Sequence, residues 1–332
     1  MTAPDRGRSE RVRAEGAAPV GEVAAEAPVN TLPVDELRVC RGEDGRVRVD
    51  PTRAGWRYLT VEAGAFGPQP FPLSLPGHEA CVVVVGGGGA TAVGPAGEQI
   101  VLDPRPSPFE ALPSAVYVPQ SEGWSVVPEP DRSGASVTLA LAWAPRSGRT
   151  EVAREPILIR PEDVAVETRG GGSMTRQISH VIDPDFPADR LIVVEVLTPG
   201  GNWSSWPPHK HDVDDMPSEA VLEEVYLYGF RRPEAWGVQR LYRRPEHEPG
   251  GPRDGVWAVR DGDLVIVTDG YHPFAAIAGD DAWYLNALAG DRRTLACSFD
   301  PDLDFIRAEW AAMGPDPRIP LVPGRKTVGA AF

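Results

Sequence analysis

The sequence has few cysteines, no long hydrophobic run and a deficit of basic residues. Its three cysteines, Cys40, Cys81 and Cys297, are odd in number and far apart, which fits neither a disulfide framework nor a zinc knuckle. No apolar run approaches the roughly 18 residues that a transmembrane helix needs, and residues 1–26 lack the hydrophobic centre of a signal peptide. We therefore expect reduced thiols, no membrane partner and a cytoplasmic location.

The charge balance also excludes a class of partner. Lys and Arg together number 33 against 48 Asp and Glu, which gives a formal net charge of −15. Nucleic-acid binding requires clustered basic side chains that displace counterions, so we expect no nucleic-acid partner. An anionic small molecule would need local positive charge from a metal ion or from a few Arg and Lys side chains.

Short apolar stretches bounded by glycine or proline fill most of the chain. Examples are residues 80–85 and 115–119 in the first half, and 191–197, 224–228 and 283–286 in the second. β-Branched and aromatic runs separated by turn residues indicate antiparallel β-structure of the sandwich or barrel type. We therefore expect an all-β protein.

The order of these features recurs in the two halves, and 332 residues is about twice a typical domain length. The repeat predicts two barrels, residues 28–165 and 166–332, with turn-forming residues near the join. Residues 1–27 contain almost no large apolar side chain and are expected to form a flexible tail.

The second half contains the most informative motif, Pro-Pro-His209-Lys-His211-Asp. Alternate side chains of a strand share one face, so both imidazoles can approach one metal ion. An H-x-H pair by itself is commonly a surface loop. Here, however, Glu224 opens a later strand and His272 follows another, the order found in the two sequence motifs of cupin barrels. The first half has His78 and Glu79 at the matching place but no H-x-H, so its barrel is expected to lack metal.

Three imidazoles and one carboxylate suit a first-row divalent cation. We expect one such ion, with zinc preferred and manganese or iron as alternatives. Glu223 and Glu224 point to opposite faces of their strand. We assign Glu224 as the ligand because it directly precedes the apolar run, and expect Glu223 to face outward or contact a neighbour.

Taken together, several stretches resemble the 5-deoxy-glucuronate isomerases of inositol catabolism, which are related to the 4-deoxy-5-threo-hexulose-uronate ketol-isomerases. The resemblance covers about residues 29–302. The stretches that carry it are Arg105–Phe109, Thr175–Gln177, Ser204–Asp212, Leu222–Glu224, Gly270–Pro273 and Tyr284–Asn286 with Ala289–Gly290. Three places depart from the pattern: Thr268-Asp269 replaces a proline and a basic residue, Trp206 stands where tyrosine is common, and the histidine of Ile-Ser-His180 is displaced. An acidic Asp269 near the metal strand leaves an altered substrate open.

The resemblance implies a bicupin, with two antiparallel double-stranded β-helix (jelly-roll) barrels. It also implies conversion of the aldose acid 5-deoxy-D-glucuronate to its ketose isomer, 5-dehydro-2-deoxy-D-gluconate, by metal-assisted proton transfer through an enediol. The implied partner is therefore a small sugar acid, and a homo-oligomer is compatible with the sequence.

Such a reaction also needs a proton shuttle and a group that binds the substrate carboxylate. The shuttle candidates in the same strands and loops are Asp212, Glu223, Tyr226, Tyr228 and Tyr284. The carboxylate-binding candidates are Lys210, Arg176 and Arg240, with arginine preferred because it forms bidentate pairs. For each of them the simpler interpretation is an ordinary surface charge.

Two other functions remain open from the sequence. A cupin dioxygenase would use the same ligand types for non-haem iron, and a sugar-acid binding cupin would bind without turnover. Oxygen consumption would favour the first, whereas redox-neutral interconversion of aldose and ketose would favour the isomerase.

Overall fold

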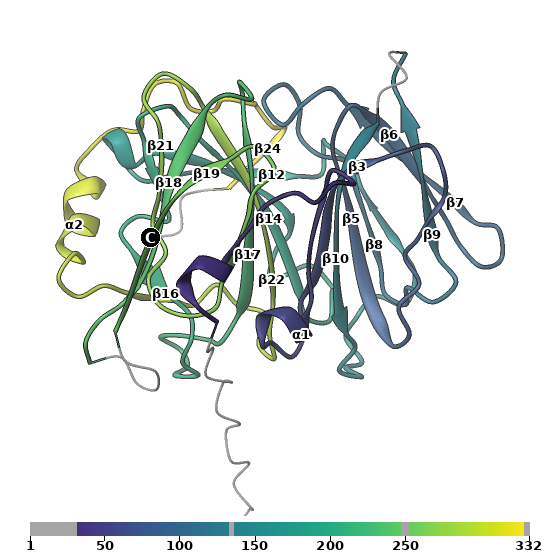
Figure 1. Ribbon diagram of the computed structural model, residues 1–332, viewed down its shortest axis with the longest axis horizontal. Coiled ribbons are helices and arrows are strands. Elements are labelled where there is room, and N and C mark those ends of the chain that lie inside the picture. Colours follow the sequence, from purple (N-terminus) through teal and green to yellow (C-terminus); the bar gives the residue numbers. More distant parts are fainter. Residues whose placement is uncertain (1–31, 133–135, 247–251, 329–332) are drawn as a thin grey trace, which may run out of the picture.

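The computed structural model describes residues 32–132, 136–246 and 252–328, and almost all regular structure there is β (Figure 1). The expected tail, residues 1–27, lies outside the described residues. The helical elements are short: η1 (Val34–Glu36), α1 (Pro51–Ala54), η2 (Gly172–Met174) and α2 (Phe305–Ala311). In these described ranges no helix has the length and apolar character to span a membrane. The all-β prediction is confirmed.

The N-terminal barrel, on the right in Figure 1, consists of two antiparallel sheets. The six-stranded sheet has, in spatial order, β11 (Ile157–Ile159), β8 (Ala115–Val118), β5 (His78–Gly86), β10 (Val137–Pro145), β3 (Thr60–Phe66) and β2 (Arg46–Val49). The four-stranded sheet has β4 (Phe71–Pro72), β9 (Ser125–Pro130), β6 (Gly88–Val93) and β7 (Gln99–Arg105).

The C-terminal barrel, on the left in Figure 1, is built around an eight-stranded sheet. Its order is β1 (Arg38–Val39), β20 (Leu264–Val267), β17 (Glu223–Phe230), β22 (Ala282–Ala289), β14 (Leu191–Thr198), β13 (Arg176–Ile182), β12 (Ala165–Arg169) and β24 (Lys326–Val328). A four-stranded sheet has β15 (Trp203–Ser204), β21 (Phe274–Ala276), β18 (Trp236–Arg243) and β19 (Arg253–Arg260). A two-stranded sheet pairs β16 (His209–Lys210) with β23 (Ser298–Phe299).

The larger hydrophobic core joins the two barrels and extends into the interior of the C-terminal one. Strand β5 shows how: Cys81 and Val83 join a core that includes Val193 and Ala287 of the C-terminal barrel, while the alternate residues of β5 join a separate core inside the N-terminal barrel. A strand buried on both faces reads as a continuous apolar run rather than an alternating one. This explains the Val-rich stretch at 82–85.

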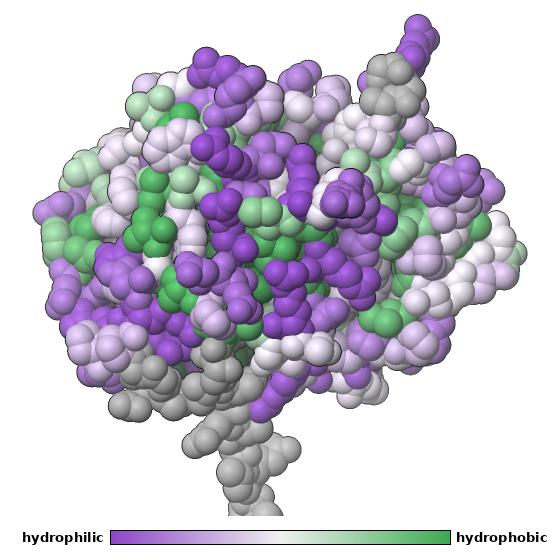
Figure 2. Space-filling model, viewed as in Figure 1, coloured by the Kyte–Doolittle hydropathy of each residue, from purple (hydrophilic) through white to green (hydrophobic). Residues whose placement is uncertain are grey.

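The two barrels differ in what fills them. The interior of the N-terminal barrel is packed with large side chains, among them Phe66, Leu73, Trp124 and Trp143. The interior of the C-terminal barrel instead contains a pocket lined by polar and charged groups as well as apolar ones. Among the described residues, the second barrel therefore offers space for a ligand in its interior. On the molecular face shown in Figure 2, hydrophilic residues predominate and hydrophobic ones form small patches.

The chain passes from one barrel to the other between Ile159, which ends β11, and Ala165, which begins β12. One segment departs from the expected division at residue 165. Arg38 and Val39 of β1 pair with Val265 and Leu264 of β20, so this early strand belongs to the C-terminal sheet. The chain thus contributes a strand to the C-terminal barrel before it forms the N-terminal barrel.

Two buried glutamates connect the barrels in a reciprocal way. Glu79 of β5 accepts hydrogen bonds from the backbone N–H groups of Asp189, Arg190 and Leu191 at 2.7–2.8 Å, just before β14. Glu223 of β17 accepts from three consecutive N–H groups, those of residues 57–59, at 2.6–2.9 Å, just before β3. Each barrel thus uses one carboxylate to bind the chain that enters the other barrel.

We expect Glu79→Gln to lower the free energy of unfolding by about 2–3 kcal/mol. The amide is a weaker acceptor than a carboxylate and places an N–H group toward backbone donors, and a hydrogen bond to a charged group contributes about 1.5–3 kcal/mol. Urea denaturation measures this loss. The exposed Glu43 provides the control, since Glu43→Gln should stay within about 0.5 kcal/mol of the wild type. Equal stability of the two variants would contradict a structural role for Glu79.

Candidate functional site

The pocket of the C-terminal barrel lies on one face of the eight-stranded sheet. Residues two apart in four neighbouring strands line its floor: Glu224 and Tyr226 of β17, Tyr284, Asn286 and Leu288 of β22, Val194 and Val196 of β14, and Arg176, Ile178 and His180 of β13. This spacing follows from strand geometry, because alternate side chains share a face. The opposite face of the same strands packs against the N-terminal barrel.

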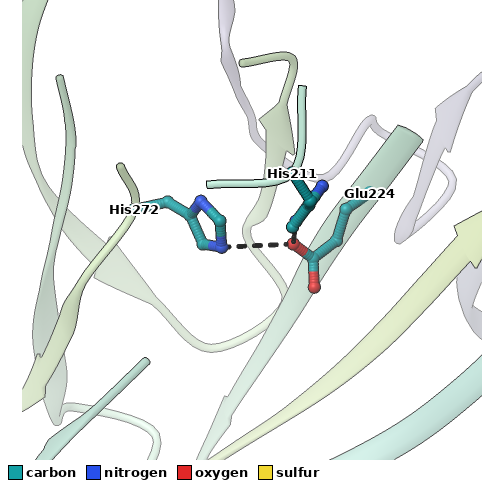
Figure 3. A group of neighbouring side chains, drawn as sticks. All are labelled: His211, Glu224 and His272. Carbon is teal, nitrogen blue, oxygen red and sulfur yellow. Dashed lines mark hydrogen bonds and ion pairs between the residues drawn. The ribbon is translucent and has the colours of Figure 1, made fainter. Parts of the chain in front are cut away.

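Three ligand-type side chains, His211, Glu224 and His272, meet at one end of this pocket. One ligand atom of each lies within 4.8 Å of the others. Nε2 of His211 is 2.9 Å from Glu224 Oε2, and Nε2 of His272 is 3.4 Å from the same oxygen. In Figure 3 the His272 ring and the Glu224 carboxylate point toward each other from separate segments of the chain. All three residues are buried.

Backbone carbonyls orient both imidazoles for metal binding. Nδ1 of His211 donates to Leu222 O at 3.0 Å, and Nδ1 of His272 donates to Gly270 O at 3.0 Å. A ring that donates through Nδ1 keeps its lone pair on Nε2, the usual arrangement for a metal-binding histidine. Burial lowers the pKa of His272 to about 4, so its ring is neutral. Its buried Nε2 has no hydrogen-bond partner in the described structure, and a divalent cation fits this arrangement.

His209, the fourth expected ligand, lies beside the cluster. Its ring centroid is 4.7 Å from that of His272 and 6.4 Å from that of His211. It lines the same pocket as His211, in agreement with the alternation of the strand. Its ring nitrogens do not belong to the group of atoms within 4.8 Å. The structure therefore brings three expected ligands together and places the fourth next to them.

Lys210 and Asp212 lie behind the histidines and do not line the pocket. Lys210 Nζ is 2.7 Å from Asp212 Oδ1 and 2.9 Å from both oxygens of Glu219. Asp212 Oδ2 accepts a 2.7 Å hydrogen bond from Gly270 N. Gly270 has a φ of +78°, and a Cβ there would lie 2.5 Å from the carbonyl oxygen of Tyr242. Asp212 thus holds the turn before His272 in place and does not line the pocket.

Asn286 is a site residue that the sequence analysis did not single out for a role. Its Nδ2 donates to Glu224 Oε1 at 2.5 Å, which leaves Oε2 to face the two histidines. Such an outer partner holds a ligand carboxylate in place. The available signal was its spacing of two residues from Tyr284, which puts both side chains on one face of β22.

Two of the tyrosine candidates, Tyr226 and Tyr284, line the pocket. Their rings are stacked, with centroids 4.7 Å apart and planes 8° from parallel. The Tyr226 hydroxyl is 2.6 Å from Ser205 Oγ. Burial raises the pKa of both phenols, so they carry their protons at neutral pH. Tyr228 does not line this pocket and donates to Gln239.

The three cationic candidates differ in their position relative to the pocket. Arg176 lines the pocket and is 5% exposed. Its Nη1 donates to the carbonyls of Met174 and Trp206, and in the described structure no carboxylate pairs with it. Arg240 is half-buried, pairs with Asp254 through two hydrogen bonds and lies outside the pocket. Of the three candidates for the substrate carboxylate, only Arg176 is positioned to contact a ligand.

Glu223 and Asp269 are turned away from the ligand cluster. Glu223 belongs to the carboxylate bridge between the barrels, where three backbone N–H groups occupy its oxygens, so it contacts a neighbour and is not placed to transfer a proton. Asp269 binds Arg243 through two hydrogen bonds and lies 3.5 Å from Arg253. Its charge is therefore balanced locally and does not enter the pocket.

Sequence and structure comparisons relate the chain to known proteins. The model of the KduI/IolB family matches residues 37–306. A 5-deoxy-glucuronate isomerase from Geobacillus kaustophilus is 38% identical over 268 residues, which cover 80% of this chain and 91% of that protein. A solved IolB-like protein from Salmonella typhimurium LT2 is 32% identical, with a TM-score of 0.72, over 82% of this chain and 99% of that one.

A more distant likeness concerns the fold alone. An oxalate decarboxylase from Lactobacillus farciminis is 10% identical, with a TM-score of 0.50, over 79% of this chain and 88% of that one. Oxalate decarboxylases have the bicupin fold, and the match extends across both barrels of this chain. The expected bicupin architecture is confirmed.

Proposed function

The chain belongs to the KduI/IolB family, and we infer from this and from the site that it is a metal-dependent isomerase of 5-deoxy-D-glucuronate. The product is 5-dehydro-2-deoxy-D-gluconate, the corresponding ketose acid. The observation that carries the proposal is the pocket itself. A buried His-Glu-His cluster and a buried arginine that pairs with no carboxylate among the described residues open onto the same space.

The metal would be held by Nε2 of His211, Nε2 of His272 and a Glu224 oxygen, with His209 as the adjacent fourth ligand. We propose zinc, with manganese and iron as the other ions that suit this ligand set. A divalent cation supplies a Lewis acid that stabilises negative charge on the oxygens of an enediol. It also supplies positive charge that an anionic substrate needs in a protein with an overall negative charge.

The residues around the cluster have separate tasks in this proposal. Arg176 binds the substrate carboxylate, which would compensate a buried positive charge that pairs with carbonyl oxygens but with no carboxylate among the described residues. The stacked phenols of Tyr226 and Tyr284 are protonated, so they donate hydrogen bonds or protons to substrate oxygens. Ser205 holds the Tyr226 hydroxyl at 2.6 Å. These two tyrosines remain our candidates for the proton shuttle.

We expect purified protein to convert 5-deoxy-D-glucuronate to the ketose acid without consuming oxygen. Proton NMR would show loss of the anomeric aldose signals and growth of the signals of a terminal CH₂OH group. Chelator treatment should abolish turnover, and adding zinc, manganese or iron singly should identify the ion that restores it. Oxygen uptake linked to loss of the sugar acid would instead indicate a dioxygenase. Tight binding without turnover by the fully metallated protein would indicate a binding protein.

A further inference from the structure

His180 lies in the wall of the pocket and has an unused ring nitrogen. It is on β13, on the same face as Arg176 and Ile178. Its side chain is 11% exposed, and Nδ1 is buried without a hydrogen-bond partner among the described residues. A buried polar atom without a partner is unfavourable. Because His180 lines the pocket, a ligand bound there could supply the missing group.

The carboxylate of Glu167 determines whether Nδ1 of His180 donates or accepts a hydrogen bond. His180 Nε2 is 3.0 Å from Glu167 Oε2. Arg169 donates to both oxygens of Glu167, at 2.7 and 2.9 Å, and these two partners lower the pKa of Glu167 to about 2 although burial opposes the shift. Because a carboxylate only accepts hydrogen bonds, Nε2 of His180 carries the proton. A neutral ring with its proton on Nε2 has its acceptor at Nδ1, and the His180 side chain lines the pocket.

The sheet register places His180 across the pocket from the metal ligands. His180 is opposite Val194, and Val194 is opposite Asn286, whose side chain binds Glu224. Strands β13 and β17 are three positions apart in the sheet, or about 14 Å between backbones at roughly 4.8 Å per strand. Side chains and the ion fill part of this distance. A chain of six carbons has five bonds of roughly 1.5 Å each, or about 7.5 Å along the chain, and bridges the remainder.

We propose that His180 recognises a hydroxyl group of the substrate on the part of the carbon chain beyond the two carbons that are isomerised. Nδ1 accepts a hydrogen bond from that hydroxyl, while Glu167 and Arg169 are positioning residues that hold the ring in the accepting tautomer. The inference rests on the proposed function, because it states which feature of the sugar acid this pocket selects. It makes His180 a specificity residue for hydroxylated acids.

The decisive variants are His180→Phe, which removes the acceptor and keeps a ring, and His180→Asn, whose Oδ1 can take the place of Nδ1. The substrates are 5-deoxy-D-glucuronate and its analogues that also lack the C3 or the C4 hydroxyl. We expect His180→Phe to raise KM for the full substrate about 10- to 100-fold, the size of one buried hydrogen bond. The value of kcat should change little, because the contact exists in both ground and transition states. His180→Asn should recover part of the loss.

For the wild type, KM for one of the two deoxy analogues should exceed KM for the full substrate by a similar factor. For His180→Phe, the KM values for that analogue and for the full substrate should be about equal. Metal content should be unchanged in every variant. His78→Ala is the matched control, since His78 lies in the N-terminal barrel, outside this pocket, and its ring is hydrogen-bonded to Pro76 O. Glu167→Gln should move the ring proton to Nδ1, because Arg169 occupies the amide oxygen. A change in the ¹⁵N chemical shifts of His180 would report this.

An equal loss on the full substrate and on both analogues would overturn the inference, as would a wild type that accepts both analogues fully. Calorimetric binding of the same acids keeps this claim separate from the isomerase assignment. If the metallated wild type binds the acid but does not isomerise it, the proposed function fails. The His180 claim is then decided by the dissociation constants of the same variants.

Discussion

Replacing His211 or His272 with alanine should remove the metal and the isomerase activity together. Each supplies an Nε2 atom to the buried cluster, and each is already held in the metal-binding tautomer by a backbone carbonyl. Loss of an outer partner alone typically costs 10- to 100-fold in metal affinity. Loss of a ligand should therefore lower affinity by more than about 100-fold. Plasma mass spectrometry and chelator competition measure content and affinity.

The adjacent glutamates give a matched pair for this experiment. Glu224→Gln should lose metal, because the amide replaces the oxygen next to both histidines. Glu223→Gln should keep metal, although it weakens the bridge between the barrels. Asn286→Ala should reduce metal affinity by about 10- to 100-fold through loss of its hydrogen bond to Glu224. Retention of metal by Glu224→Gln with loss in Glu223→Gln would show that the assigned ligand is wrong.

His209→Ala tests the fourth ligand separately. Its ring is next to His272, but its nitrogens lie outside the group of three. A loss of affinity comparable to that of His272→Ala is expected if His209 coordinates the ion. Full metal content and unchanged affinity would leave a site of three protein ligands.

Removing Arg105 should cause the largest loss of stability of any single change that we predict. Arg105 of β7, in the N-terminal barrel, and Glu195 of β14, in the C-terminal barrel, form a buried bidentate ion pair. Its N–O distances are 2.7 and 2.8 Å, and 2–3% of each side chain is exposed. Deleting one partner leaves an uncompensated buried charge. Arg105→Ala should therefore lower the free energy of unfolding by about 3–5 kcal/mol, as measured by urea denaturation.

Two further variants distinguish buried charge from general damage. The double variant Arg105→Met, Glu195→Gln removes both charges and should recover part of the loss, since replacing a whole buried pair is often close to neutral. Arg240→Ala breaks an exposed pair with Asp254 and should cost at most about 1 kcal/mol. A loss in Arg105→Ala no larger than in Arg240→Ala would contradict the importance of the pair.

The metal cluster was largely predictable because its signals are local. His209 and His211 are two residues apart, and Glu224 and His272 stand at a strand start and after a strand end, so their types and spacing carry the chemistry. The same rule of alternation predicts that Glu224 and Glu223 point to opposite faces, and in the structure only Glu224 of the two lies beside the histidines. Lys210 was a candidate for binding the substrate carboxylate, but it pairs with Asp212 and Glu219. The all-β fold was predictable for a similar reason, since short apolar runs and turn residues are local features.

The roles of several polar residues were not predictable, because those roles depend on partners that are distant in the sequence. Asp212 and Glu223 were chosen as proton shuttles by their position next to ligands, yet one binds the turn at Gly270 and the other binds the backbone of the opposite barrel. His180 was ordinary in the sequence, and its pocket position depends on the strand that pairs beside it. Periodicity shows that two faces of a strand differ, but not which face meets the pocket.

The sequence by itself determined the strand-rich architecture, the duplication and the set of residue types able to bind a metal ion. Only the tertiary structure decided which barrel contains space, which of the candidate charges face that space, and how β1 and the carboxylates of Glu79 and Glu223 connect the barrels. The physical reason is the distance along the sequence over which each interaction acts. Strand alternation and turn preference act between residues close in the chain, whereas burial, charge pairing and cavity shape are set by packing between strands more than 100 residues apart.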